Sequence, residues 1–282
     1  LPQGTSDFYF EEAPELRLAS QWGRHFLEFY GGADNFTYLK ASQLNLTDWN
    51  VGADGRYDIS RAATVTASAS YAELHESLES PNTAGAQAAP NRYFKDHGDL
   101  AAVYQPSRLG ISLGGTFDRY DWENTPRIGG GELNNKDRNE DEYQGTLKTF
   151  YEFSPGYSAF VQGIYGVRRF DRFFDRDGFH RSSHGYRFDG GVDLTLTHLL
   201  KGEVFLGYLR QDYAQDVPLP LANVSGLDFG ASLDWYATSL ITVHLGGGRT
   251  VEDSTIFESS AIDNRYGSLS ADYEFKRNII FQ

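Results

Sequence analysis

Alternation of apolar and polar residues, repeated along almost the whole chain, is the feature that most limits what this sequence can fold into. In the segment 49–57, residues such as Val51 and Tyr57 share one side, whereas Asp54 and Arg56 share the other. After a break at 58–61 the same alternation resumes. Successive side chains of a strand point to opposite faces, so each segment is predicted to be a strand with one apolar and one polar face. Two such strands joined by a tight turn predict a hairpin.

The apolar row of this hairpin has small side chains in its middle and aromatic ones towards its ends, whereas the residues of the other row are small and polar. In a soluble sandwich, the apolar residues would be large enough to interdigitate with a second sheet. The observed distribution fits a sheet whose apolar side meets lipid and whose polar side meets water. The hairpin by itself leaves a soluble β protein open, because alternation is common to both classes.

The connections between the strands follow a regular order along the chain. Short turns are expected at 22–24, 58–61, 106–108, 154–156, 198–200, 237–239 and 276–278, and long polar loops at 39–46, 76–91, 123–139, 172–182, 214–222 and 252–263. Short turns alternating with long loops are typical of an outer-membrane barrel. The sequence therefore predicts an all-β fold, a transmembrane antiparallel up-and-down β-barrel with about 14 strands. No linker composition divides the chain, so one domain over residues 1–282 is expected.

Composition narrows the function classes. The chain has no cysteine, which excludes a disulfide framework and cysteine catalysis. A net charge of -14 excludes nucleic acid as a partner, because phosphate binding needs a basic surface. No run of 18 apolar residues is present, so no transmembrane helix is expected. The mean hydropathy of -0.50 is compatible with membrane strands, because only every second residue of such a strand faces lipid.

The direction of the strands leads to an expectation about completeness. If 22–24 is a turn on the periplasmic side, the single strand expected before it, over 10–21, runs away from the outer side, and one earlier strand is missing. The strand that begins at Asn278 stops after a few residues. Because bacterial barrels have even strand numbers, we expect about 16 strands or more in the complete protein.

Two segments carry a resemblance to a known family. The run NVGADGRYDISRAATVTASASYAELHES, from Asn50 to Ser77, and the run SADYEFKRNII, from Ser270 to Ile280, resemble the putative beta-barrel porin 2 family. The pattern extends in weaker form over nearly all of the chain. The resemblance implies an outer-membrane barrel of a Gram-negative bacterium in a transport setting, often associated with exopolysaccharide synthesis and export. It carries over no catalytic motif and no residue-specific role.

Three functions remain open at this point. The first is a solute pathway that takes part in exopolysaccharide export. The second is a general diffusion porin with cation preference, and the third is a structural or adhesive scaffold without a conducting lumen. An enzyme is not expected, because no nucleophile motif is present. The expected partners are outer-membrane lipid and lipopolysaccharide, with exopolysaccharide and periplasmic export proteins under the first function.

No cofactor or metal is expected, since the run from Asp175 to Gly178 is only a fragment of a calcium loop. The surrounding segment, 168–187, is the one basic and aromatic cluster in an acidic chain. Aromatic rings stack on sugar faces and guanidinium groups hold anions, so this cluster predicts a glycan or lipopolysaccharide contact. The alternative is that its arginines pair with the neighbouring aspartates. The candidate contact residues are Arg172, Phe173, Phe174, Arg176, Phe179 and Arg181.

Inward-facing aspartates recur three to five residues before the short turns, so they are expected to form one acidic layer in the lumen. Such a layer favours cations. The alternative is that each aspartate pairs with a lumen arginine such as Arg56 or Arg187. Lys148 is expected to interrupt the layer. The predicted ring consists of Asp54, Asp193, Asp234 and Asp272.

Overall fold

The computed structural model describes residues 7–20, 22–76, 80–82, 87–194, 199–215, 217–238, 240–276 and 279–281. Nearly all of the strands in this part of the chain belong to one antiparallel sheet. The strands are β1 (Tyr9–Glu12), β2 (Glu15–Ala19), β3 (Phe26–Tyr38), β4 (Leu46–Asp58), β5 (Ala63–His75), β6 (Arg92–Tyr104), β7 (Leu109–Trp122), β8 (Thr125–Pro126), β9 (Glu132–Leu133), β10 (Glu140–Ser154), β11 (Tyr157–Phe170), β12 (Ser183–Leu194), β13 (Leu200–Tyr213), β14 (Val224–Tyr236), β15 (Ile241–Asp253), β16 (Ala261–Lys276) and β17 (Ile279–Phe281).

Fourteen strands follow one another across the sheet in chain order, with β2 beside β3 and with β8 and β9 set apart as a small hairpin. The predictions of an all-β fold and of about 14 strands are therefore confirmed. Two short 3-10 helices, η1 (Ser42–Leu44) and η2 (Lys136–Arg138), lie in connections. Among the described residues, neither helix is long and apolar enough to span a membrane.

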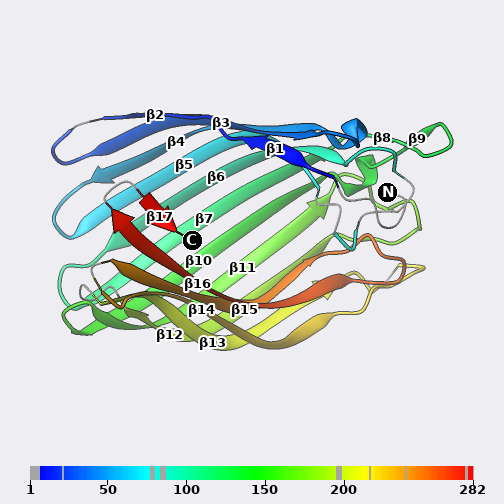
Figure 1. The fold of residues 1–282 in the computed structure, drawn as a ribbon. Helices are drawn as coiled ribbons and strands as arrows, with labels where there is room; N and C mark the ends of the chain where they lie inside the picture. Colours follow the sequence, from blue (N-terminus) through cyan, green and yellow to red (C-terminus); the bar gives the residue numbers. More distant parts are fainter. Residues whose placement is uncertain are drawn as a thin grey trace.

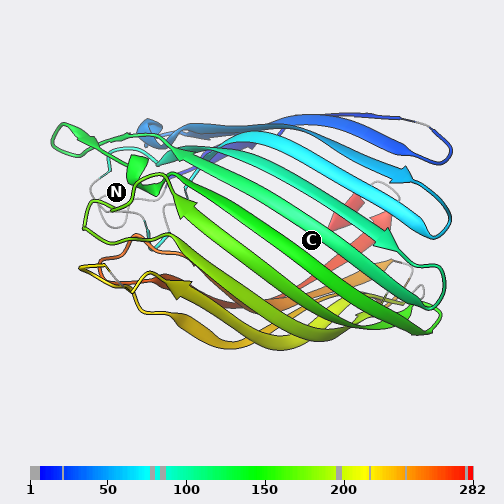
Figure 2. The ribbon, with the colours of Figure 1, turned by 180° about the vertical axis from the view of Figure 1, so that it is seen from behind.

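The sheet curls so that β3 and β4 lie opposite β12 and β13, with all strands steeply tilted (Figures 1 and 2). Its two edges, at β1 and β2 and at β17, do not pair with each other in the described part of the chain. Short turns gather at one end of the curled sheet, and long loops gather at the other, where β8 and β9 lie. We call these the turn end and the loop end.

The two faces of the sheet differ in chemistry. Cross-strand pairs share a face, and the register places Leu113, Leu147 and Gly163 together on one side. That side carries large exposed apolar residues, among them Leu113 at 63% and Leu269 at 74% exposure. A face of exposed apolar residues cannot be a soluble core, so it is the outer face of the curled sheet. The polar row of the sequence pattern is the inner face.

The segment expected as a single strand over 10–21 is instead two short strands, β1 and β2, and this expectation was wrong. Ala13 and Pro14, between them, are not part of a strand. Proline has no backbone N–H and cannot donate to the neighbouring strand. The carbonyl of Pro14 still accepts a hydrogen bond of 3.1 Å from the N–H of Ala33.

The other connections lie close to their predicted places, with two differences. The loop expected at 252–263 is shorter, because β15 extends to Asp253 and β16 begins at Ala261. The loop expected at 123–139 contains the β8–β9 hairpin. The predicted turn residues His198, Ser239, Arg277 and Asn278 lie outside the described residues.

Part of the inner face of β11 is apolar, and this part is covered. Phe160 points inward and is 4% exposed. Its ring lies over Gly191 of β12, where a Cβ would sit 2.6 Å from the ring. The ammonium group of Lys148, another residue of the inner face, lies 3.7 Å from the centre of the same ring. The ring fits against β12 because Gly191 has no side chain, and the Lys148 ammonium group makes this part of the inner surface charged.

Candidate functional site

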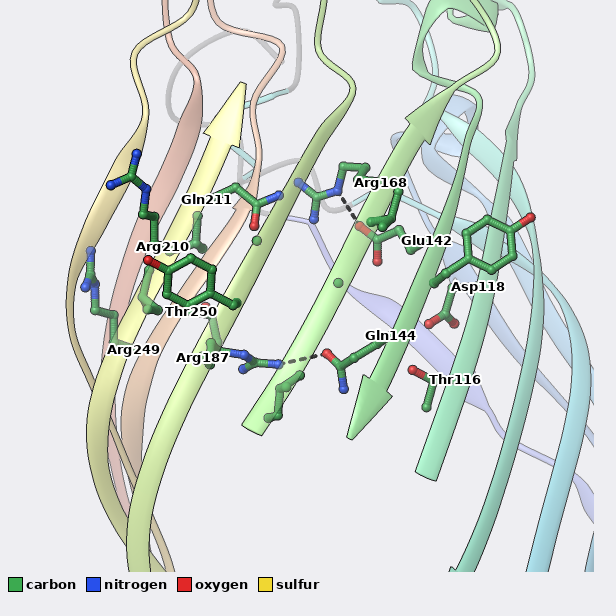
Figure 3. Close-up of a pocket in the computed structure, with 18 residues that line it drawn as sticks. Thr116, Asp118, Glu142, Gln144, Arg168, Arg187, Arg210, Gln211, Arg249 and Thr250 are labelled. Carbon is green, nitrogen blue, oxygen red and sulfur yellow. Dashed lines mark hydrogen bonds and ion pairs between the residues drawn. The ribbon is translucent and has the colours of Figure 1, made fainter. Parts of the chain in front are cut away.

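The inner wall of the sheet holds a cavity of about 300 Å³ lined by β7, β10 to β13 and β15 (Figure 3). On one side of it, Arg168 Nε donates to Glu142 Oε1 at 2.5 Å. Lower on the same wall, Arg187 Nη2 donates to Gln144 Oε1 at 2.8 Å. Glu142 and Arg168 are directly paired across β10 and β11, whereas Arg187 of β12 reaches Gln144 of β10 across β11, and all four side chains are on the inner face. The predicted basic cluster over 168–187 is therefore not one loop, because Arg168 and Arg187 belong to the wall.

Acid–base contacts continue along the wall towards β6. Lys95 Nζ and His97 Nδ1 both lie 2.9 Å from Asp118 Oδ1. All three side chains are partly exposed on the inner face. Partly exposed ion pairs keep the surface hydrated and charged, unlike a sealed apolar core. The inner wall is chemically suited to contact with water and polar solutes.

Acidic residues outnumber basic ones on this face. The register from β2 to β16 assigns to the inner face the acids Glu15, Glu28, Asp34, Asp48, Asp54, Asp58, Asp99, Asp118, Glu140, Glu142, Glu152, Asp189, Asp193, Glu203, Asp228, Asp234, Glu252 and Asp272, and the bases Arg17, Arg56, Lys95, Lys148, Arg168, Arg187 and Lys201. A surplus of carboxylates gives the inner space a negative potential.

Two acids near the turn end of the wall share one lysine. Asp193, a member of the predicted ring, stands directly across from Glu203 of β13. Lys148 Nζ lies 3.0 Å from Asp193 Oδ2 and 2.8 Å from Glu203 Oε2. Lys148, which was expected to interrupt the predicted acidic layer, lies between these two carboxylates, so two acids share one ammonium group. Sequence reasoning missed Glu203, although its cross-strand position would have followed from the register.

Two further members of the predicted ring are joined by a histidine. His244 Nδ1 lies 2.7 Å from Asp234 Oδ1, and His244 Nε2 lies 3.2 Å from Asp272 Oδ2. The three residues come from the neighbouring strands β14, β15 and β16. Asp54 lies apart, on β4, where its direct cross-strand neighbour is Glu28. Neither Asp234 nor Asp272 pairs with an arginine in the described part of the chain, which was the alternative interpretation.

A buried acid pair lies beside these groups, and sequence reasoning did not find it. Asp189 and Asp228 stand in one cross-strand row on either side of Gly207. A Cβ on Gly207 would lie 2.2 Å from Asp189 Oδ1, so this carboxylate leans over the glycine. Asp228 is 1% exposed, and neither of its carboxylate oxygens has a hydrogen-bond partner among the described residues. A buried carboxylate without a donor is costly, which makes this pair a strained point of the wall.

The predicted glycan-contact residues divide into three groups. Phe179 and Arg181 are each 4% exposed, so their side chains are not available at the surface, and the prediction fails for them on this ground. Arg176 forms an ion pair with Asp137 in another loop, with 2.8 Å between Nε and Oδ2.

The remaining three residues, Arg172, Phe173 and Phe174, are exposed. Phe173 stacks on His180 with 4.2 Å between ring centres, and packs edge-on against Phe174. This arrangement holds two rings at the surface of the loop end.

The described residues contain no group of three or more His, Cys, Asp or Glu side chains arranged to hold a metal ion. Among curated proteins, no relative matches the sequence. A comparison with protein families gives a match over residues 1–282 to the family described as putative beta-barrel porin 2. The match agrees with the curled antiparallel sheet and its polar inner wall. The chain belongs to the putative beta-barrel porin 2 family.

Proposed function

We propose that this protein is an outer-membrane barrel whose acidic inner face is a pathway for polar solutes, with a preference for cations. The observation that carries the proposal is the opposition of the two faces, one with exposed leucines and aromatic residues and one with a surplus of carboxylates. A surface of the first kind is stable in contact with lipid tails, and one of the second kind is stable in contact with water.

The length of the strands fits a bilayer. Strands β4, β5 and β6 each have 13 residues. At a rise of about 3.3 Å per residue and a tilt of about 40°, such a strand spans about 33 Å along the membrane normal. A hydrocarbon core of about 30 Å is crossed by that length. The turn end then faces the periplasm, and the loop end faces outward, as in other bacterial barrels.

Cation preference is tested by reversal potentials across a KCl gradient in planar bilayers. We expect the potential to favour K⁺, and to shift towards zero when Asp193, Asp234 and Asp272 are together replaced by Asn. The matched control is Asp212→Asn, which removes one acid that bonds to Arg210 on the outer face. Anion preference in the unmodified protein would contradict the proposal.

The role in the cell follows from the solutes that pass. We propose export of exopolysaccharide, in company with periplasmic export proteins, since the family resemblance points to that setting. A general diffusion porin is the second candidate, and a scaffold without a conducting lumen is the third. Liposome swelling with sugars of graded size separates a pathway from a scaffold. A deletion strain that secretes normal amounts of polysaccharide would exclude export and leave the diffusion porin.

The exposed residues Arg172, Phe173 and Phe174 are proposed to contact an anionic glycan or lipopolysaccharide at the loop end. A guanidinium group binds anionic groups, while flat rings contact sugar faces. Replacing Arg172 with Gln should weaken binding of anionic glycans, with an effect that shrinks at high salt because exposed charges are screened. The control is Arg265→Gln, an exposed arginine on β16. Equal binding by both variants at low salt would refute the contact.

A further inference from the structure

Four of the long loops at the loop end are joined to one another in a closed circuit of contacts. The first link connects the start of the loop between β5 and β6 to the segment before β10. Arg138 donates from Nη1 and Nη2 to the two carboxylate oxygens of Glu76, at 3.0 and 2.8 Å. Both side chains are buried, and the guanidinium group of Arg138 also stacks on Trp122 at 3.4 Å from the ring centre. This link is a buried, two-bonded ion pair.

Asparagine side chains strengthen the same link. Asn91, at the far end of the first loop, donates to Glu76 Oε2 at 2.6 Å. Its Oδ1 accepts from Thr125 Oγ1 at 2.7 Å and from Asn135 Nδ2 at 3.3 Å. Asn91 and Asn135 are each 1% exposed, so these bonds lie inside the loop assembly. The two loops therefore behave as one packed unit.

The second link runs to the loop between β11 and β12. Asp137 accepts three bonds from Arg176, from Nε and Nη2 at 2.8 Å each and from the backbone N–H at 3.1 Å. Burial raises the pKa of the Asp137 carboxyl, but the hydrogen bonds and charge of Arg176 outweigh burial and hold that pKa below its ordinary value of 3.8. The pair is therefore ionised at neutral pH.

The third link runs from this loop to the one between β15 and β16. Arg181 is held by Asp175, with 2.6 Å between Nε and Oδ2. Its Nη1 donates to the carbonyl oxygens of Ser254 and of Ser259, the latter at 3.0 Å. Phe179 adds an edge-on contact with Phe257, at 5.4 Å between ring centres. The arginine predicted to bind a ligand is instead a clamp between two loops.

The fourth link closes the circuit, and it is the weakest. The N–H of Thr255 donates to Asn82 Oδ1 at 2.8 Å, and Thr255 Oγ1 donates to the carbonyl of Asn82 at 3.2 Å. These are bonds between neutral groups, whereas the other three links contain arginine. In the sheet, β6 and β15 are separated by β7 and by every strand from β10 to β14. This link joins distant parts of the curled wall and does not follow its rim.

A cavity beneath the loops also brings together side chains of β6, β7 and β15. It has a volume of about 280 Å³ and is lined by Tyr93 of β6, Trp122 of β7 and Glu252 of β15. Side chains of strands that are far apart in the sheet thus share one small space. The loop end narrows where the circuit of contacts lies.

We propose that these loops form a cap over the outward mouth of the pathway, and that the cap opens at the neutral link between Asn82 and Thr255. The proposal rests on the proposed solute pathway. The three arginine links keep the loops together, and the neutral link is the one that breaks and re-forms. Passage of a solute from the inner space then requires the loop between β15 and β16 to separate from 80–82.

The test uses the absence of cysteine from the chain. In the double variant Asn82→Cys with Thr255→Cys, oxidation should form a disulfide between the two positions, which a mass spectrum confirms. The conductance in planar bilayers should then be at least tenfold lower in the oxidised form than after reduction. A matched control is Asn35→Cys with Thr47→Cys, which joins directly paired positions of β3 and β4. Oxidation of the control should leave the conductance unchanged.

A releasing variant completes the test. Arg181→Gln removes the clamp on the loop between β15 and β16, and it should raise the fraction of time spent in the open state. Equal conductance in the locked and releasing variants would overturn the cap, and so would thiols that stay free under oxidation. If no variant conducts and none admits sugars into liposomes, the proposed pathway fails, which is a different result from failure of the cap.

Discussion

Glu76→Gln is expected to loosen the loop end by a large and measurable amount. The carboxylate of Glu76 and the guanidinium group of Arg138 are 7% and 8% exposed, so solvent screens their attraction little. Removing one partner of a buried ion pair costs about 3–5 kcal/mol, because the other charge stays buried without compensation. A cost of about 3 kcal/mol corresponds to roughly 150-fold in the equilibrium between closed and open loops.

Amide hydrogen exchange in detergent micelles measures this change. The N–H of Glu76, which donates to the carbonyl of Asn91 at 2.8 Å, should exchange roughly 100-fold faster or more in the variant. The N–H of Val161, in the middle of the β10–β11 pair, is the internal control and should not change. A second replacement, Arg138→Met, should restore part of the protection, since it removes the uncompensated charge. A change of less than about tenfold at Glu76 would refute the reasoning, because it would give the pair no more than the value of a surface ion pair.

Three other outcomes are expected, one from the loop end and two from the inner wall of the sheet. Burial raises the pKa of Glu76, but Arg138 outweighs burial and holds that pKa below 4.5, so the cap contacts keep their full contribution above this pH and lose it as the pH falls further. Protection of the Glu76 amide, measured against an unstructured chain at the same pH, should therefore fall below pH 4.5. Asp228→Asn should stabilise the fold by about 1 kcal/mol, because the amide can donate a hydrogen bond to Asp189 Oδ1. In a gel that separates folded from heat-unfolded protein, the folded band should then persist to a higher temperature, and a lower temperature would contradict this. His244→Gln should make cation preference stronger at acidic pH, where the imidazole between Asp234 and Asp272 carries a positive charge, and reversal potentials at two pH values check it.

The fold could be predicted from the sequence to a large degree, because a two-residue period is a local property. Each strand shows its own faces, and the turn residues show where it ends. The break at Pro14 was visible as a residue without an N–H, yet it was passed over because the apolar pattern continues on both sides. The β8–β9 hairpin was not predicted, since two-residue strands have no period.

The candidate site was less predictable, because it depends on which strands stand side by side. Asp193 was placed on the inner face, but its partner Lys148 is 45 residues away and reaches it across β11. The interpretation of Arg181 as a surface ligand was wrong for a similar reason. Its partners, the carbonyls of Ser254 and Ser259, are backbone groups, and a pattern of side chains cannot predict contacts with the backbone. Register and loop contacts, rather than residue type, decide these roles.

The central claim is that one face of the sheet meets lipid and the other meets water, and spin labels along one strand test it most directly. Single cysteines placed in the cysteine-free chain at Ile111, Ser112, Leu113 and Thr116 of β7 carry nitroxide labels in proteoliposomes. We expect labels at Ile111 and Leu113 to collide with oxygen, which dissolves in lipid, and labels at Ser112 and Thr116 to collide with a water-soluble nickel chelate. Equal access of the nickel chelate to all four positions would contradict the account.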